Sequence, residues 1–129
     1  MIRTALAFAA ATAAFATTPA AAQAPREIGK ETTIAFAGGG GIRNWEKGES
    51  DDIVYLQGRR LEWYRVVLSG PCLRFASSPT LVYNTDTNGR FDRFSTISDA
   101  RTPEVRCGVE SVKTSLPPKG QPGHKTAGR

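Results

Sequence analysis

The stretch from Leu61 to Cys72 constrains the fold of this chain more than any other part of the sequence. Successive side chains of a β-strand point to opposite sides of a sheet. With that period, large apolar groups fall on one side (Leu61, Trp63 and Val67) and also on the other (Tyr64, Val66 and Leu68). A strand with two apolar faces needs cover on both, so we expect it at the centre of a sheet.

This central strand ends at Gly70-Pro71, because proline lacks a backbone donor and fixes φ. The next residue is Cys72, and the chain has only one other cysteine, Cys107. We expect the two to form a disulfide in an oxidising compartment. Closing a loop of this length stabilises a fold by about 3 to 4 kcal/mol. The alternative is a pair of reduced, buried thiols.

Shorter β-prone runs lie on either side of the central strand. The run Ile53–Leu56 predicts an antiparallel hairpin with the central strand, with Arg59 and Arg60 at its exposed tip. A second hairpin is expected at Asn88-Gly89, because both residues tolerate positive φ. The run 32–37 predicts a strand with Ile34 and Phe36 on one face, and the run 105–112 predicts a last strand that turns Val105, Cys107 and Val109 inward.

These runs predict an all-β fold, a small antiparallel barrel or sandwich of about five to seven strands with one disulfide. No segment after residue 24 has the pattern of a long amphipathic helix, although a short helical turn near Trp45 is an alternative.

Three parts of the chain are expected. Residues 1–24 have the basic start, apolar run and small residues of a signal peptide, ending in Ala22-Gln23-Ala24. Residues 25–116 form a single β domain, and residues 117–129 form a basic, disordered tail rich in Pro and Gly. No later run reaches the roughly 18 to 20 apolar residues that cross a bilayer. We therefore expect a periplasmic or secreted protein with no membrane span.

The net charge of +5 comes mainly from the ends of the chain. Arg3 lies in the leader and Lys119, Lys125 and Arg129 lie in the tail, whereas all 12 acidic residues lie between them. A nearly neutral domain does not favour nucleic acid as a partner.

Few residues are suited to catalysis. His124, the only histidine, lies in the predicted tail, and a disulfide would occupy both thiols. No cofactor or metal ligand set is recognised, and we expect a protein that is not an enzyme. The alternative is a small hydrolase that uses two carboxylates from a set of five: Glu46, Glu49, Asp51, Asp52 and Glu62.

Aromatic and guanidinium groups gather near the first hairpin, a composition typical of binding surfaces. The candidate binding residues are Arg59, Arg60, Trp63, Tyr64, Arg65 and Trp45. They predict a non-catalytic binding or structural module, expected to be a monomer, with an envelope protein or an anionic ligand as partner. Two alternatives stay open: the aromatic residues belong to the core beneath a solvated rim of arginines, or the fold is an oligonucleotide-binding type of barrel.

Several short motifs resemble, in order and spacing, a family of small exported proteobacterial proteins known as a domain of unknown function. The motifs are Ile34-Ala35-Phe36, Asn44-Trp45, Trp63-Tyr64-Arg65, Gly70-Pro71-Cys72, Asp92-Arg93-Phe94-Ser95, and Cys107 with Ser111-Val112. The resemblance implies a Gram-negative envelope setting and paired cysteines, and it brings no catalytic residue, cofactor or ligand. Some members resemble lipoproteins, whereas this sequence lacks the anchoring cysteine.

Overall fold

The computed structural model describes residues 13–14 and 26–124, which contain six β-strands and no helix. The strands are β1 (Asn44–Lys47), β2 (Ile53–Gln57), β3 (Trp63–Leu68), β4 (Leu81–Tyr83), β5 (Thr96–Asp99) and β6 (Cys107–Ser115). All pairs are antiparallel, in the order β1-β2-β3-β6-β5-β4. The predicted all-β antiparallel fold is confirmed, and six strands lie within the predicted range.

The predicted signal peptide, residues 1–24, lies outside the described residues except at positions 13 and 14. Among the residues that are described, no helix has the length and apolar character needed to cross a bilayer.

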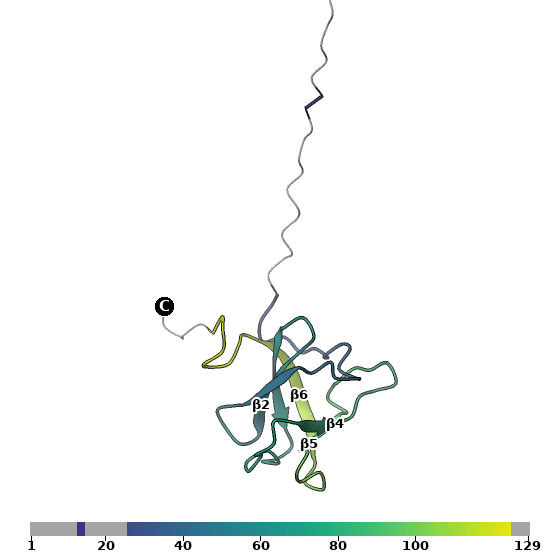
Figure 1. Ribbon diagram of the computed structural model, residues 1–129, viewed down its shortest axis with the longest axis vertical. Helices are drawn as coiled ribbons and strands as arrows, with labels where there is room; N and C mark the ends of the chain where they lie inside the picture. The colour runs from purple at the N-terminus through teal and green to yellow at the C-terminus, as the bar shows by residue number, and fades with distance from the viewer. Residues whose placement is uncertain (1–12, 15–25, 125–129) are drawn as a thin grey trace, which may run out of the picture.

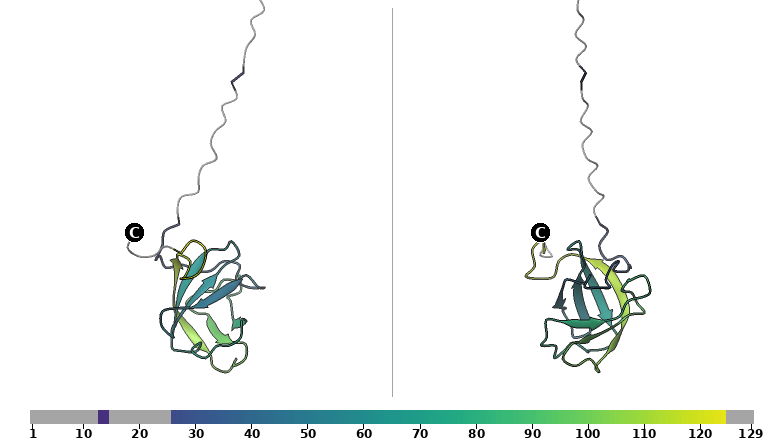
Figure 2. Two further views of the ribbon diagram at one scale, coloured as in Figure 1. Left: turned by 60° about the vertical axis from the view of Figure 1, so that its left-hand side comes forward. Right: turned by 45° about the vertical axis from the view of Figure 1, so that its right-hand side comes forward.

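The sheet is strongly curved but does not close into a barrel (Figures 1 and 2). Strands β4 and β5 run across the lower end of the part formed by β2, β3 and β6 (Figure 1). The edge strands β1 and β4 do not pair; instead the Trp45 Nε1–H donates to the carbonyl of Pro79, 2.8 Å away, just before β4. The predicted fold is a barrel or a sandwich. A barrel requires a closed sheet, and closure is not observed.

The core lies on the concave face of the sheet and follows the alternation of its central strands. In β3, the predicted central strand, Tyr64, Val66 and Leu68 are buried in the core cluster. The hairpin between β2 and β3 is confirmed, with Leu56 opposite Tyr64. Buried residues from outside the strands also belong to the cluster: Ile34, Ala37, Leu73 and Phe91.

Strand β6 pairs with two different segments along its second edge. At its start, Cys107 and Gly108 pair with β5. Towards its end, the amides of Gly29 and Thr32 donate to the carbonyls of Thr114 and Val112, at 2.8 and 2.9 Å. The first part of the folded chain thus lies beside its last strand.

The predicted disulfide between Cys72 and Cys107 is confirmed. Their Cα atoms lie 5.8 Å apart, in the middle of the range that a disulfide spans. It joins the turn after β3 to the first residue of β6, two segments that already lie side by side.

Three local predictions are wrong, and one local alternative is not observed. Phe36 does not share a buried face with Ile34, because its positive φ of 56° turns it outward and leaves it 64% exposed. Val105 is exposed because it lies in a turn before β6. Asn88-Gly89 turns within a longer loop, held by hydrogen bonds to Asp86, rather than joining two paired strands directly. Trp45 lies in strand β1, not in a helical turn.

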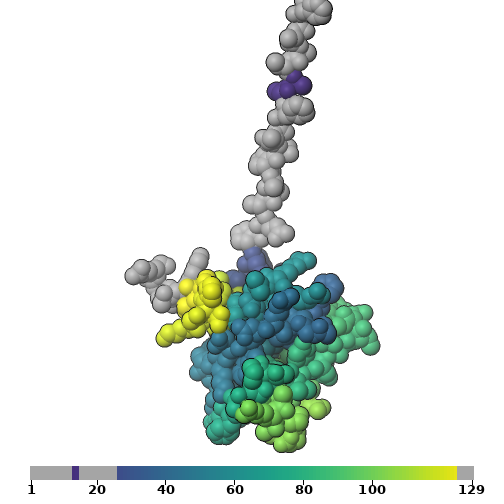
Figure 3. Space-filling model, viewed as in Figure 1, coloured from purple at the N-terminus to yellow at the C-terminus, as the bar shows by residue number. Residues whose placement is uncertain are grey.

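Residues 117–124 form turns that lie against the body of the molecule, shown in yellow in Figure 3. The Gln121 Nε2–H donates to Glu46 Oε1 at 2.6 Å. Residues 125–129 lie outside the described residues, so disorder of that part of the predicted tail stays a prediction.

Candidate ligand-binding pocket

The tip of the β2–β3 hairpin is a tight turn that projects two arginines. The Gly58 amide donates to the carbonyl of Glu62 at 2.9 Å, and the Leu61 amide donates to Gly58 at 3.1 Å. This geometry requires positive φ at the last residue of the loop, a position that usually holds glycine. Leu61 occupies it with φ 66°, so Arg59 and Arg60 lie exposed at the tip of a strained turn.

A cavity of about 500 Å³ lies beside this tip. We call it the arginine pocket, and its lining residues are Ala35, Phe36, Arg43, Arg59, Arg60, Glu62 and Tyr64. Three arginines, one glutamate and two aromatic residues from three parts of the chain thus line one cavity.

Both ends of the loop 36–43, Phe36 and Arg43, line the arginine pocket. The chain reverses sharply here, and the Gly41 amide donates to Ala37 at 3.1 Å. A Cβ atom at Gly41 would lie 1.6 Å from the carbonyl oxygen of Phe36, so only glycine fits. After the reversal, the Arg43 amide donates to the carbonyl of Gln57 at 2.8 Å, which fixes its backbone beside the hairpin.

Glu62 and Tyr64 form the floor of the pocket. The Tyr64 hydroxyl donates to Glu62 Oε1 at 3.2 Å, while Glu62 Oε2 is buried with no hydrogen-bond partner among the described residues. Burial, together with the negative charge of Glu62, raises the pKa of Tyr64. The guanidinium of Arg26 covers the Tyr64 ring, 4.5 Å from its centre.

Among the described residues, the three arginines of the pocket take part in no ion pair, unlike Arg65, Arg74 and Arg90. In the described part of the chain, ion pairs join Arg65 to Glu49, and likewise Arg74, Arg90 and Lys30 to nearby carboxylates. Arg43, Arg59 and Arg60 take part in none of these pairs. Their charge therefore reaches the cavity without internal neutralisation, apart from the single carboxylate of Glu62.

The structure separates the six candidate binding residues predicted from the sequence. Arg59, Arg60 and Tyr64 line the arginine pocket. Trp63 and Arg65 alternate with Tyr64 along β3 and therefore point to the opposite, convex face of the sheet. Trp63 is 3% exposed, so it offers no surface for binding.

Trp45, the sixth candidate, lines a neighbouring cavity of about 330 Å³ in the opening between the edge strands β1 and β4. We call this the seam cavity. Its lining residues are Gly40, Ile42, Arg43, Asn44, Trp45, Pro79, Thr80, Leu81 and Tyr83. Arg43 lines both cavities.

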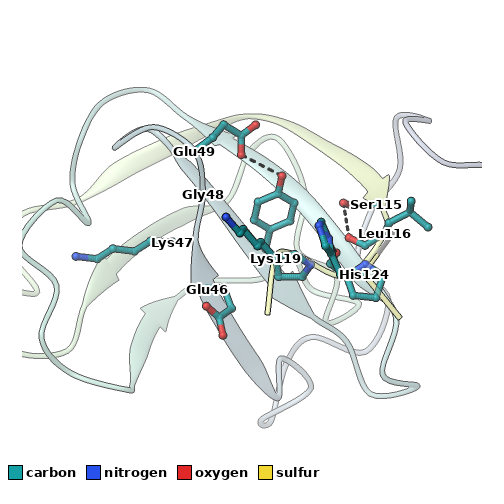
Figure 4. Close-up of a pocket in the computed structure, with 11 residues that line it drawn as sticks. Glu46, Lys47, Gly48, Glu49, Ser115, Leu116, Lys119 and His124 are labelled. Atoms are coloured by element: carbon teal, nitrogen blue, oxygen red, sulfur yellow. Dashed lines mark hydrogen bonds between the residues drawn. The ribbon is translucent and has the colours of Figure 1, made fainter. Parts of the chain in front are cut away.

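On the convex face, Glu49 lines a third cavity of about 450 Å³ (Figure 4), and its carboxylate also holds Arg65. Arg65 Nη2 and Nε lie 2.7 and 3.0 Å from Glu49 Oε1, and the Tyr55 hydroxyl donates to Glu49 Oε2 at 3.0 Å. Partial burial raises the pKa of Glu49, but these hydrogen bonds and that of its own amide outweigh burial and lower it overall. Both carboxylate oxygens are therefore engaged.

The other predicted carboxylates are dispersed. Asp51 pairs with Arg74, Asp52 accepts the Ser50 hydroxyl, and Glu62 lies in the arginine pocket. Glu46 and Glu49 line the same cavity, and His124 lies there with them (Figure 4), while Glu49 and Asp51 both line a smaller cavity of about 100 Å³. The sequence placed His124 in a tail apart from the fold, whereas its Nδ1 lies 2.8 Å from the carbonyl of Pro117 at this cavity.

Sequence reasoning missed Phe36 and Arg43 as pocket residues. Phe36 had the position of a core residue in a β-prone run, and its neighbours gave no sign of a positive φ. Arg43 lies next to Asn44, which pairs with Gln57 at the end of β2. If Asn44–Lys47 had been predicted as a strand, Arg43 would have been placed near Arg59. The polar residues of this segment do not have the pattern of a strand, so the strand was not predicted.

No protein-family model, curated protein or solved structure matches this chain. The resemblance to small exported proteobacterial proteins therefore stays a prediction, based on the motifs alone.

Proposed function

We propose that this protein is a non-catalytic binding module that holds an anionic ligand in the arginine pocket. The observation that carries this proposal is the convergence of Arg43, Arg59 and Arg60 on one cavity with no ion-pair partner in the described part of the chain. Guanidinium groups bind carboxylate and phosphate oxygens through paired, charge-assisted hydrogen bonds.

Backbone strain at the same place supports the proposal. Phe36 and Leu61 are the two non-glycine residues with positive φ in the described part of the chain. One lines the arginine pocket and the other holds the tip that carries Arg59 and Arg60. Strained residues of this kind gather at ligand sites, where the surroundings hold them in place.

Export belongs to the same proposal. A disulfide persists in the periplasm or outside the cell, and Cys72–Cys107 is consistent with such a compartment. The signal-like residues 1–24 support the same setting. A monomer remains our expectation for the oligomeric state.

The experiment that tests ligand binding is an NMR titration with inorganic phosphate and with acetate at low ionic strength, because salt screens exposed charges. The R59Q/R60Q variant should bind either probe at least about tenfold more weakly, since each lost charge-assisted hydrogen bond has a large effect on affinity. The R93Q/R106Q variant removes the same charge from exposed sites outside the pocket and should bind within about twofold of the native protein. Equal affinities in the two variants would show that the pocket is not the site.

A second candidate is a small hydrolase, favoured by the presence of Glu46 and Glu49 with His124 at the convex-face cavity. A general acid must hold a proton at the working pH, whereas the lowered pKa of Glu49 keeps it ionised. Glu46 would have to supply the proton, although its Oε1 accepts a hydrogen bond from Gln121. Turnover of chromogenic glycosides or esters that is abolished in E46Q would support this candidate against the binding module.

A further inference from the structure

Phe36 is the residue of the arginine pocket whose position is not explained by the binding of a charge. It lines the pocket and is 64% exposed, with a positive φ of 56°. Apolar side chains gain free energy when they leave water, and residues other than glycine rarely adopt positive φ. The position of Phe36 is therefore unfavourable in the free protein, and a ligand that covered its ring would offset part of that cost.

The two phenylalanines that are more exposed than Phe36 have partners that it lacks. Phe75 is 85% exposed and Phe94 is 80% exposed. The guanidinium of Arg74 lies over the Phe75 ring, 5.9 Å from its centre, and that of Arg93 lies over the Phe94 ring at 5.2 Å. In the part of the chain that the structure describes, no guanidinium or second aromatic ring covers Phe36 in this way. Its ring is open, although three arginines line the same pocket.

Tyr64, the second aromatic residue of the pocket, is buried. The guanidinium of Arg26 lies over its ring, and its hydroxyl donates to Glu62. Phe36 is therefore the aromatic residue of the pocket that can stack against a ligand. The volume of the cavity, about 500 Å³, lies within the range of roughly 300 to 1,000 Å³ that is typical of small-molecule sites.

We infer that the ligand is a monocyclic aromatic anion, with benzoate as its simplest form. Its negative group binds Arg59 and Arg60, and its ring packs against Phe36 in the same cavity, in the offset or edge-to-face arrangement that aromatic pairs prefer. Guanidinium groups also stack on aromatic faces, so the arginines suit the ring of the ligand as well as its charge. This inference rests on the proposed function, because it requires the arginine pocket to bind the charged group.

The test is an NMR titration of the whole chain with four probes at low ionic strength: benzoate, cyclohexanecarboxylate, acetate and benzamide. Burial of the ring should make benzoate bind at least about fivefold more tightly than acetate. Cyclohexanecarboxylate has the same charge and a similar size but no aromatic face, and it should bind at least about twofold more weakly than benzoate. Benzamide has the ring without the charge and should bind at least about tenfold more weakly.

Variants of Phe36 locate the ring of the ligand. F36L keeps an apolar side chain and removes the aromatic face, so it should weaken benzoate at least about threefold while leaving acetate within about twofold of the native protein. F36Y keeps the aromatic ring and should bind benzoate within about twofold of the native protein. F75L removes an exposed aromatic ring outside the pocket and should bind benzoate like the native chain.

The outcomes separate the two proposals. If acetate and benzoate bind equally and both depend on Arg59 and Arg60, the pocket binds anions but the inferred aromatic ring is wrong. Cyclohexanecarboxylate or benzamide binding as tightly as benzoate, or F36L leaving the benzoate affinity intact, also overturns the inference. If neither carboxylate nor phosphate binds, the proposed function itself fails.

Discussion

The β2–β3 hairpin carries arginines in two different states, and the difference separates a structural charge from one available to a ligand. Arg65, on the convex face, is neutralised by Glu49, whose other oxygen is bound by Tyr55. Arg59 and Arg60, at the tip, face a cavity with no ion-pair partner in the described part of the chain. The charge on the convex face of this hairpin is therefore neutralised within the protein, whereas the charges at its tip can bind an anionic ligand.

The largest effect is expected from the loop that holds Arg43 and Phe36 in place. In G41A the new Cβ would collide with the Phe36 carbonyl, so the loop must rearrange at a cost of about 3 kcal/mol in unfolding free energy. In G39A the new Cβ would have no neighbouring atom within 4 Å, so the cost is that of placing alanine at a positive φ. We expect it to lower the unfolding free energy by about 1 to 2 kcal/mol. Urea unfolding of both variants measures the difference. Equal losses would mean that the tight reversal does not hold the loop in place.

The second prediction compares the two kinds of arginine directly. R65Q should lower the unfolding free energy by up to about 1 kcal/mol, because both partners are partly solvated and solvent screens the pair. R59Q, which breaks no ion pair, should leave stability within about 0.3 kcal/mol. Anion affinity should respond in the opposite way, falling in R59Q and staying unchanged in R65Q. Urea unfolding and a phosphate titration of the same samples test both halves, and a reversed pattern would remove the distinction.

The third prediction uses pH. Because the pKa of Glu49 is lowered in the folded state, its carboxylate stabilises the fold above its unfolded pKa of about 4.3, and this contribution is lost as pH falls through the folded pKa. The stability difference between the native chain and E49Q should stay constant above about pH 5.5 and shrink at lower pH. Urea midpoints measured from acidic to neutral pH provide the check. E110Q removes a negative charge from an exposed site of β6 as a control, and a parallel pH profile in the two variants would contradict the role of Glu49.

The smallest effect concerns strain at the hairpin tip. Asparagine tolerates positive φ better than leucine, so L61N should raise the unfolding free energy by about 0.5 to 1 kcal/mol. Leu116, an exposed leucine at the convex-face cavity without positive φ, supplies the control, and L116N should bring no gain. Thermal unfolding of the two variants decides the point, and a loss of stability in L61N would mean that the tip is not strained.

Local patterns were sufficient to predict the hairpin, because it depends on neighbouring residues and on the alternation of β3. The disulfide joins residues 35 positions apart, and its prediction followed from the presence of only two cysteines in the chain. The short edge strand β1 was not predicted, since Asn44–Lys47 has one apolar residue and gains its stability from pairing with β2. The same limit applies to the site. The hairpin alone places Arg59 and Arg60 together, whereas Arg43 and Phe36 join them through a chain reversal that only tertiary packing reveals.

The pairing of Gly29 and Thr32 with the end of β6 has a consequence for folding. The first segment of the domain is bonded to its last strand, so a chain that is being synthesised cannot complete its sheet before the end of β6, at Ser115, has been made. Closure over such a long sequence separation makes folding slow. Until then the apolar residues of β3 lack the strand that flanks them, which makes the incomplete sheet prone to aggregation.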